Sequence, residues 1–142
     1  MHMNYMSLAE FYSLLGDAEK SEAYLDKADA LQRAIQSVLW VEEDQMWFDF
    51  DFLNTAPRKY FFPSNLFPLW AECYSPADRM KVAEAAVSYL KKTGAIFCNG
   101  GVPTSLDESG QQWDFPNAWP PLQHILVAGT YYVETCHVFS LG

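Results

Sequence analysis

The run from Gly110 to Pro121 constrains this sequence more than any other segment. It reads Gly-Gln-Gln-Trp-Asp-Phe-Pro-Asn-Ala-Trp-Pro-Pro, and so brings two indoles, one carboxylate and two adjacent glutamine amides close together. Its closing prolines predict the start of a helix, since proline fits the first turn of a helix but not its interior. Indoles stack on the C–H face of a sugar, while carboxylates and amides bind its hydroxyls. The alternative is a well-packed loop whose tryptophans fill a core and whose polar groups cap a helix.

The same run carries a resemblance to a known family. Residues Gln112 to Pro121 look like the second sequence signature of the trehalases, the inverting glycoside hydrolases that split α,α-trehalose into two glucoses. Two further segments are similar to that family: Gly101 to Ser105, and Tyr60 to Trp70 in the form that animal trehalases carry. The resemblance extends from near the first residue to about Gly129.

The resemblance also implies which side chains meet the sugar. The candidates for substrate binding are Gln111, Gln112, Trp113, Asp114 and Trp119. Pro103 and Thr104 are weaker candidates. Two structural interpretations stay open beside this one. Asp114 could cap the helix that begins near Pro120, and Trp119 could be a core residue.

Inverting hydrolysis of a glycosidic bond needs two carboxyl groups roughly 6.5–9.5 Å apart, one as general acid and one as general base. By residue type, the candidates are Asp107, Glu108 and Asp114. The resemblance assigns neither role to them. It implies an acid in a Glu-Ser-Gly-Trp-Asp type segment upstream and a base downstream of the signature, and neither segment is recognised here. The first trehalase signature, Pro-Gly-Gly-Arg-Phe-x-Glu, is absent as well. We therefore expect no catalytic residue in this chain and no hydrolysis by the chain alone.

The fold implied by the resemblance is an (α/α) toroid of the six-hairpin glycosidase type. A chain of 142 residues is too short for a complete toroid, which suggests an internal fragment or a truncated isoform. We expect an all-α partial toroid with a short extended segment near residues 46–52. Residues 1–130 would be part of the catalytic domain, and residues 131–142 a divergent C-terminal tail. A partial toroid exposes apolar surfaces, which favours association with other molecules.

Local signals predict a helical hairpin at the N-terminus. A first helix from Tyr5 to Leu15 closes on Gly16, and Asp17 is suited to cap a second helix over residues 18–40. The expected buried face of the second helix follows the i, i+3, i+4, i+7 spacing. Its members are Leu31, Ala34, Ile35, Val38 and Leu39.

Two more long helices are predicted further on. One begins at Ser75-Pro76, with Ser75 as N-cap, and ends before Gly94, whereas the other opens at Pro120. The apolar side chains expected to face the core are Met80, Ala83, Val87 and Leu90 in the first, and Leu122, Ile125, Leu126 and Val127 in the second. Between the hairpin and these helices, residues 42–52 alternate aromatic and acidic side chains, typical of a short strand or an extended loop. There, Asp49 and Asp51 fit a solvated strand face better than a catalytic pair.

The charge and the cysteines exclude several classes of function. A formal net charge of −9 argues against nucleic acid and anionic membranes as partners, and a neutral sugar is indifferent to it. No run approaches the roughly 20 apolar residues of a transmembrane helix. Residues 1–16 lack the pattern of a signal peptide, although full-length animal-type relatives are usually secreted or membrane-anchored.

The three cysteines are widely spaced and indicate free thiols, with one disulfide left open: Cys73, Cys98 and Cys136.

No cluster of histidine, cysteine and carboxylate residues has the spacing of a metal site, and no phosphate-binding loop occurs, so no cofactor is expected. We expect His2 and His137 in disordered ends and His124 in the core or at its rim. Two other functions stay open. The hairpin could serve a non-catalytic interaction module, or the chain could belong to a different (α/α) toroid glycosidase.

Overall fold

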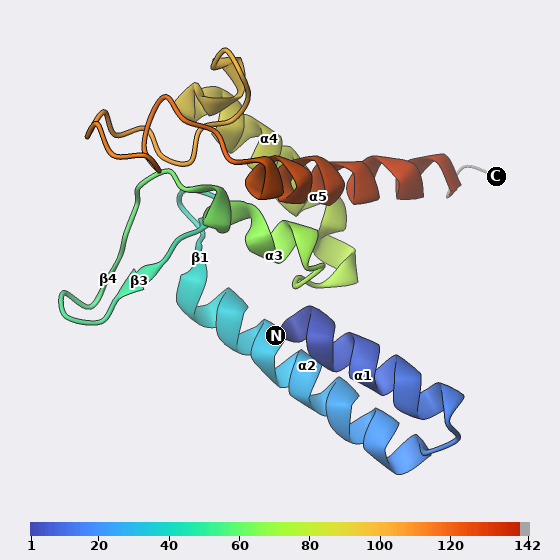
Figure 1. Cartoon of the computed structure of the whole chain (residues 1–142). Coiled ribbons are helices and arrows are strands. Elements are labelled where there is room, and N and C mark those ends of the chain that lie inside the picture. The colour runs from blue at the N-terminus through green and yellow to red at the C-terminus, as the bar shows by residue number, and fades with distance from the viewer. Residues whose placement is uncertain (140–142) are drawn as a thin grey trace.

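The computed structural model describes residues 1–139, with side chains as far as Tyr131, and it is built almost wholly from helices (Figure 1). In chain order the elements are α1 (His2–Leu14), α2 (Ala18–Leu39), β1 (Trp40–Val41), β2 (Met46–Trp47), β3 (Phe50–Asp51), β4 (Ala56–Pro57), η1 (Pro63–Leu66), α3 (Phe67–Trp70), η2 (Pro76–Asp78), α4 (Arg79–Thr93), η3 (Ala95–Phe97) and α5 (Pro120–Phe139). The predicted all-α class with a short extended segment near residues 46–52 is confirmed. None of the helices in the described part of the chain has the length and apolar character needed to cross a bilayer.

The N-terminal hairpin forms as its local signals predict. The carboxylate of Asp17 accepts a hydrogen bond from the backbone N–H of Lys20 at 3.1 Å and so caps α2. Ser21 donates to the carbonyl of Ala9 at 2.8 Å, which fixes the two helices against each other. In Figure 1 the hairpin lies below the group formed by α3, α4 and α5.

The buried face of α2 differs in part from the expectation. Ile35 and Leu39 pack against the core and Ala28 is fully buried, whereas Ala34 and Val38 are exposed. The buried line advances by three or four residues at a time, and the two exposed positions lie to one side of it. Periodicity alone predicts a wider apolar stripe than the neighbouring elements cover.

Two short antiparallel strand pairs follow α2. β1 pairs with β2 and β3 pairs with β4. Asp51 accepts hydrogen bonds from the backbone N–H groups of Leu53 and Asn54 at 2.9 and 3.1 Å, and these bonds close the second hairpin turn. The carboxylate of Asp51 is therefore a turn-forming group, in agreement with a structural rather than a catalytic role.

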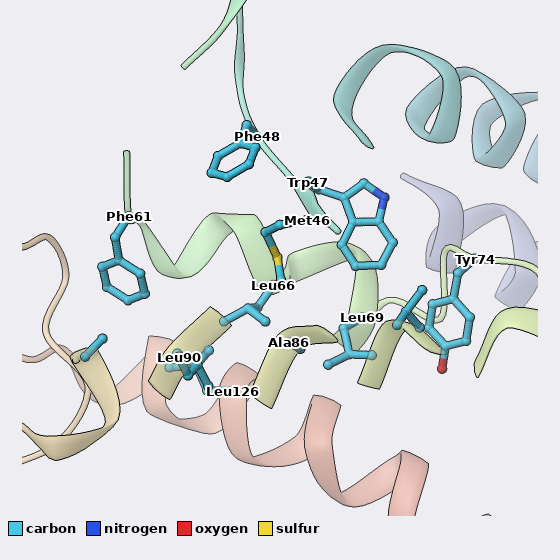
Figure 2. Close-up of a cluster of buried hydrophobic side chains, with 12 residues drawn as sticks. Met46, Trp47, Phe48, Phe61, Leu66, Leu69, Tyr74, Ala86, Leu90 and Leu126 are labelled. Atoms are coloured by element: carbon cyan, nitrogen blue, oxygen red, sulfur yellow. The ribbon is translucent and has the colours of Figure 1, made fainter. Parts of the chain in front are cut away.

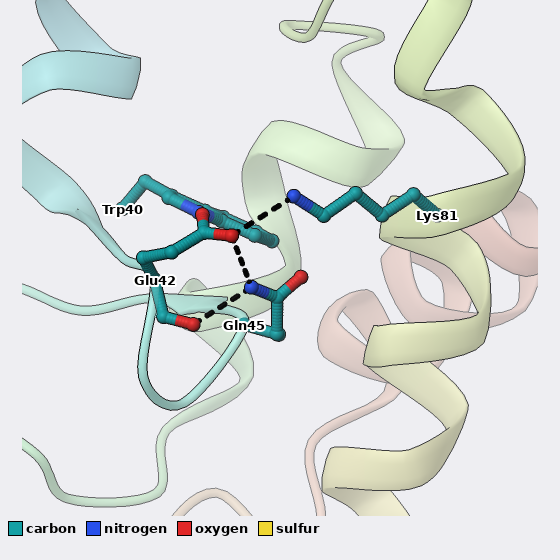
Figure 3. Close-up of polar contacts among 4 residues, drawn as sticks. All are labelled: Trp40, Glu42, Gln45 and Lys81. Atoms are coloured by element: carbon teal, nitrogen blue, oxygen red, sulfur yellow. Dashed lines mark hydrogen bonds and ion pairs between the residues drawn. The ribbon is translucent and has the colours of Figure 1, made fainter.

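The first strand pair is tied to α4 through Glu42 (Figure 3). The indole N–H of Trp40 donates to Glu42 at 2.6 Å, and the side-chain amide of Gln45 donates at 2.7 Å. The ammonium of Lys81 lies 3.2 Å from the same carboxylate. These contacts, first the bond from Trp40, lower the pKa of Glu42 to about 2.

The core lies where β2, α3, α4 and α5 meet (Figure 2). Its buried members are Met46, Trp47, Phe48, Phe61, Leu66, Leu69, Tyr74, Val82, Ala86, Leu90, Ala95 and Leu126. Gly129 lets α5 approach α3, because a Cβ at this position would lie 3.2 Å from the backbone of Trp70. An alanine at position 129 would require the backbone near Trp70 to shift by a few tenths of an ångström.

The apolar faces of α4 and α5 are partly rotated from those expected. Val82, Ala86 and Leu90 are buried in α4, whereas Met80 and Val87 are exposed. Packing against β2 and α5 selects this line, so the predicted stripe is correct only at Leu90 and, in part, Ala83.

The expectations for single residues of α4 and α5 are confirmed at some positions and wrong at others. In α5, Leu126 is buried as expected, but Val127 is 67% exposed. The hydroxyl of Ser75 makes no capping hydrogen bond, although Pro76 does open the helical segment as a 3₁₀ turn. Gly94 ends α4 in the left-handed conformation, as predicted.

The structure places three histidine and cysteine side chains where the expectations can be tested most directly, and His124 is a fourth: it is exposed on α5, so its expected place in the core or at its rim is wrong. His2 is buried, and its Nδ1 lies 3.1 Å from the carbonyl oxygen of Ala71, so its assignment to a disordered end is wrong. The side chain of His2 is buried because helix α1 already begins at residue 2. Cys73 and Cys98 are free thiols, as expected, and burial raises the pKa of Cys73 to about 11. His137 and Cys136 lie outside the described side chains.

Candidate functional site

The long loop between α4 and α5 and the segment after α2 gather at one end of the helices (Figure 1). A cavity of about 360 Å³ joins them, because residues of both segments line it. Leu106 and Asp107 contribute from the loop between α4 and α5, and Tyr60 and Phe61 from the segment after α2. The loop that carries the sequence signature therefore lies beside the segment from Tyr60 to Trp70, which shares the family resemblance.

Asp114 is the central polar group of this loop. The hydroxyl of Ser105 donates to Oδ1 of Asp114 at 2.6 Å, and the hydroxyl of Ser109 donates to Oδ2. These two bonds, first that from Ser105, lower the pKa of Asp114. Both carboxylate oxygens thus accept from serines and not from the first amides of α5. The interpretation of Asp114 as a cap for α5 is wrong.

Backbone hydrogen bonds shape the loop around Asp114. The N–H of Phe115 donates to the carbonyl of Asp107 at 3.1 Å, and the N–H of Thr104 donates to the carbonyl of Asn117 at 3.0 Å. These bonds pair residues 104–107 with residues 115–117. Asp114 therefore sits on an ordered frame, although no helix or strand runs through it.

The loop is anchored to α5 through Gln123. Its side-chain oxygen accepts from the N–H of Val102 at 3.0 Å, and its side-chain nitrogen donates to the carbonyl of Val102 at 2.7 Å. Gly101 makes room for this amide, because a Cβ there would lie 2.9 Å from its oxygen and Gly101 has a φ of +115°. The sequence therefore needs glycine at the point where the loop touches the helix.

Two tryptophans form an aromatic corner at the surface of the loop. The rings of Trp113 and Trp119 meet edge to face, with centroids 5.3 Å apart and planes at 66°. Trp113 is 52% exposed and Trp119 is 44% exposed. The interpretation of Trp119 as a core residue is therefore wrong, because its ring closes on Trp113 and not on the buried cluster.

The remaining candidates fall into exposed and buried groups. Gln111 and Gln112 are exposed, and so are Asp107 and Glu108. Pro103 is buried, and Thr104 is half-buried in the frame of the loop. Asp114, both tryptophans and both glutamines lie within residues 111–119 of this loop.

Sequence reasoning assigned no role to the two serines that hold Asp114. Ser105 lay within a segment of resemblance, and Ser109 lies just ahead of Gly110. Each serine Oγ also accepts a backbone N–H two residues further on, from Asp107 at 3.3 Å and from Gln111 at 3.1 Å. A serine followed by such a turn is a weak local signal for a hydroxyl held in place.

In the segment from Tyr60 to Trp70, the side chain of Asn65 makes two hydrogen bonds that hold the segment in place. This side chain is buried and donates to the carbonyl of Tyr60 at 2.9 Å and to the hydroxyl of Tyr89 at 3.0 Å. It lies inside η1 and bonds across to α4. Within the described residues, no group of three or more histidine, cysteine or acidic side chains could hold a metal ion.

Comparison with known proteins identifies the family. The family model described as Trehalase matches residues 1–138. The chain belongs to the trehalase family.

Its relatives include animal and bacterial trehalases. A trehalase of Apis mellifera is 42% identical over 127 residues, which is 89% of this chain and 20% of the relative. A trehalase of Homo sapiens is 41% identical over 122 residues, which is 86% of this chain and 20% of the relative. A periplasmic trehalase of Salmonella paratyphi A is 35% identical over 123 residues, covering 87% of this chain and 20% of the relative. The chain spans about a fifth of the length of these relatives.

The fold has a solved counterpart in the neutral trehalase Nth1 of Saccharomyces cerevisiae. The TM-score is 0.76 at 19% sequence identity, and the match covers 94% of this chain and 26% of the yeast chain. The predicted partial (α/α) toroid is confirmed, as is the animal type of the resemblance. The boundary expected at residue 130 and the roles of the site residues stay predictions.

Proposed function

We propose that this chain supplies the sugar-contact loop of a trehalase, which in complete form hydrolyses α,α-trehalose to two glucoses with inversion. One observation carries the proposal: the loop of the signature presents two exposed indoles and a carboxylate held by two hydroxyls. The names of the animal and bacterial relatives support trehalose as the substrate. Family membership favours trehalase over other toroid glycosidases.

The loop offers two kinds of sugar contact. The rings of Trp113 and Trp119, inclined at 66°, present apolar faces suited to the C–H face of a pyranose. An ionised carboxylate has about four lone-pair sites, and the two serines occupy only part of those of Asp114. Asp114 can therefore accept from sugar hydroxyls, and Gln111 and Gln112 add exposed amides.

Asp114 is suited to accept hydrogen bonds rather than to protonate the leaving oxygen. The general acid of a glycosidase needs a raised pKa, whereas the serine hydroxyls lower the pKa of Asp114. In this proposal the acid and base come from parts of a complete trehalase that correspond to no segment of this sequence. The chain alone then binds sugar without cleaving it.

A chimera tests this proposal. Residues of this chain would replace the matching region of the Apis mellifera trehalase, to which they are 42% identical. We expect the chimera to release glucose from trehalose and the isolated chain to release none. A chimera that folds but leaves trehalose intact would overturn the proposal, and so would turnover by the isolated chain.

Two substitutions in the chimera then test the loop. Asp114→Asn removes a charged acceptor, and a hydrogen bond to a charged group contributes roughly 1.5–3 kcal/mol, so kcat/KM should fall about 10- to 150-fold. Glu108→Gln removes one negative charge at an exposed position of the same loop and should leave kcat/KM within about twofold. Equal effects of the two changes would contradict sugar contact by Asp114.

A further inference from the structure

We propose that Ser105 is a positioning residue that fixes the carboxylate of Asp114 for a sugar hydroxyl, while Ser109 only covers the second oxygen until sugar displaces it. The inference rests on the proposed function of the loop. It assigns different tasks to two serines that make the same kinds of bond.

The two serines match in their hydrogen bonds. Each hydroxyl donates to one oxygen of Asp114, and each Oγ accepts a backbone N–H two residues further along the chain. A hydroxyl has a single proton to donate. Because that proton goes to Asp114 in both cases, the carboxylate is held from two sides.

The two serines differ in their access to water. Ser105 is 1% exposed, whereas Ser109 is exposed. A buried hydroxyl that loses its partner has no water to replace it, so the bond from Ser105 to Asp114 persists. The hydroxyl of Ser109 can turn to solvent at little cost. An incoming sugar hydroxyl can therefore take the place of Ser109 at Oδ2, but not that of Ser105 at Oδ1.

This arrangement orients Asp114 before sugar arrives. Ser105 lies in the segment 102–107, which Gln123 and Phe115 tie to α5 and to the second half of the loop. The fold therefore fixes the orientation of the Asp114 carboxylate before any ligand binds. Preorganisation of this kind raises affinity, because less conformational freedom is lost on binding.

The test uses the full chain, labelled with ¹³C and ¹⁵N, and titrates it with trehalose and with glucose. Ser105→Ala should weaken sugar binding about 10-fold, the effect of losing one hydrogen bond to a charged group. Ser109→Ala is the matched control and should change the affinity by no more than about twofold. Ser105→Thr keeps the hydroxyl and should restore most of the affinity.

A second readout does not depend on sugar. The carboxyl ¹³C shift of Asp114, followed against pH, reports its pKa. Ser105→Ala should raise this pKa toward that of an ordinary aspartate by more than Ser109→Ala does, since the bond from Ser105 is the larger cause of the lowering. A purely structural effect of Ser105 would lower the melting temperature without this difference between the two variants.

The outcomes separate the inference from the proposed function. If the wild-type chain binds neither sugar, the function proposed for the loop fails and the inference fails with it. If the wild type binds but both alanine variants bind equally well, the positioning role alone is overturned. If Ser105→Ala does not fold, the wild type decides: the hydroxyl proton signal of the buried Ser105 should persist when sugar binds. Loss of the Ser105 signal would overturn the inference.

Discussion

The side-chain amide of Gln123 pairs with both backbone polar groups of Val102, accepting from its N–H at 3.0 Å and donating to its carbonyl at 2.7 Å. A single side chain of α5 thus makes the two hydrogen bonds with Val102 that a neighbouring β-strand would make. This contact joins α5 to the segment that carries Ser105.

The first prediction concerns this pairing. Gln123→Glu keeps an acceptor for the Val102 N–H but cannot donate to its carbonyl, and Gln123→Ala loses both bonds. A group left without its partner costs about 1–3 kcal/mol, so the free energy of unfolding should fall in the order wild type, Glu, Ala. Urea denaturation measures this order. Gln112→Ala, at an exposed position, serves as control and should unfold like the wild type.

The second prediction compares two neighbouring glycines. Gly100 and Gly101 both have positive φ, at +93° and +115°, but only at Gly101 would a Cβ meet the Gln123 amide, at 2.9 Å. Each alanine substitution strains the backbone by roughly 1–3 kcal/mol. Gly101→Ala should cost more than Gly100→Ala because it also displaces Gln123. Equal melting temperatures of the two variants would show that the contact with Gln123 does not matter.

The third prediction concerns stability against pH. The pKa of Glu42 is lowered from 4.5 to about 2 in the folded chain. A lowered pKa means that the ionised group stabilises the fold above pH 4.5, and that this contribution is lost as the pH falls toward 2. The melting temperature of the wild type should therefore drop between these values by more than that of Glu42→Gln. Parallel pH profiles would contradict the network of Trp40, Gln45 and Lys81.

The helices of this chain could be predicted from local signals. Asp17 and Gly94 act within one turn of a helix end, and Pro120 needs no partner elsewhere to open α5. Which apolar residues face inward could not be predicted as well. Val87 and Val127 have the spacing of a buried stripe, yet they are exposed because packing among β2, α3, α4 and α5 selects a neighbouring line.

The sequence placed the candidate site residues in one loop but could not predict the hydrogen bonds around them. The resemblance marks Trp113 and Asp114, and they do lie in one loop with Trp119. The partners of Asp114 were missed, because a hydroxyl reaching a carboxylate across an irregular loop leaves no periodic pattern. Trp119 was left open between a sugar contact and a core residue, because an aromatic side chain usually signals a core; here its ring meets another exposed indole.

The central claim is that the signature loop contacts sugar, and the five indole N–H signals of this chain test it directly. Two of them belong to the loop, at Trp113 and Trp119, and the other three serve as internal controls at Trp40, Trp47 and Trp70. On titration of the ¹⁵N-labelled chain with trehalose, we expect the two loop signals to shift in a saturable way while the three controls stay in place. If the loop signals do not move, or if only the controls shift, the loop is not a sugar-contact site.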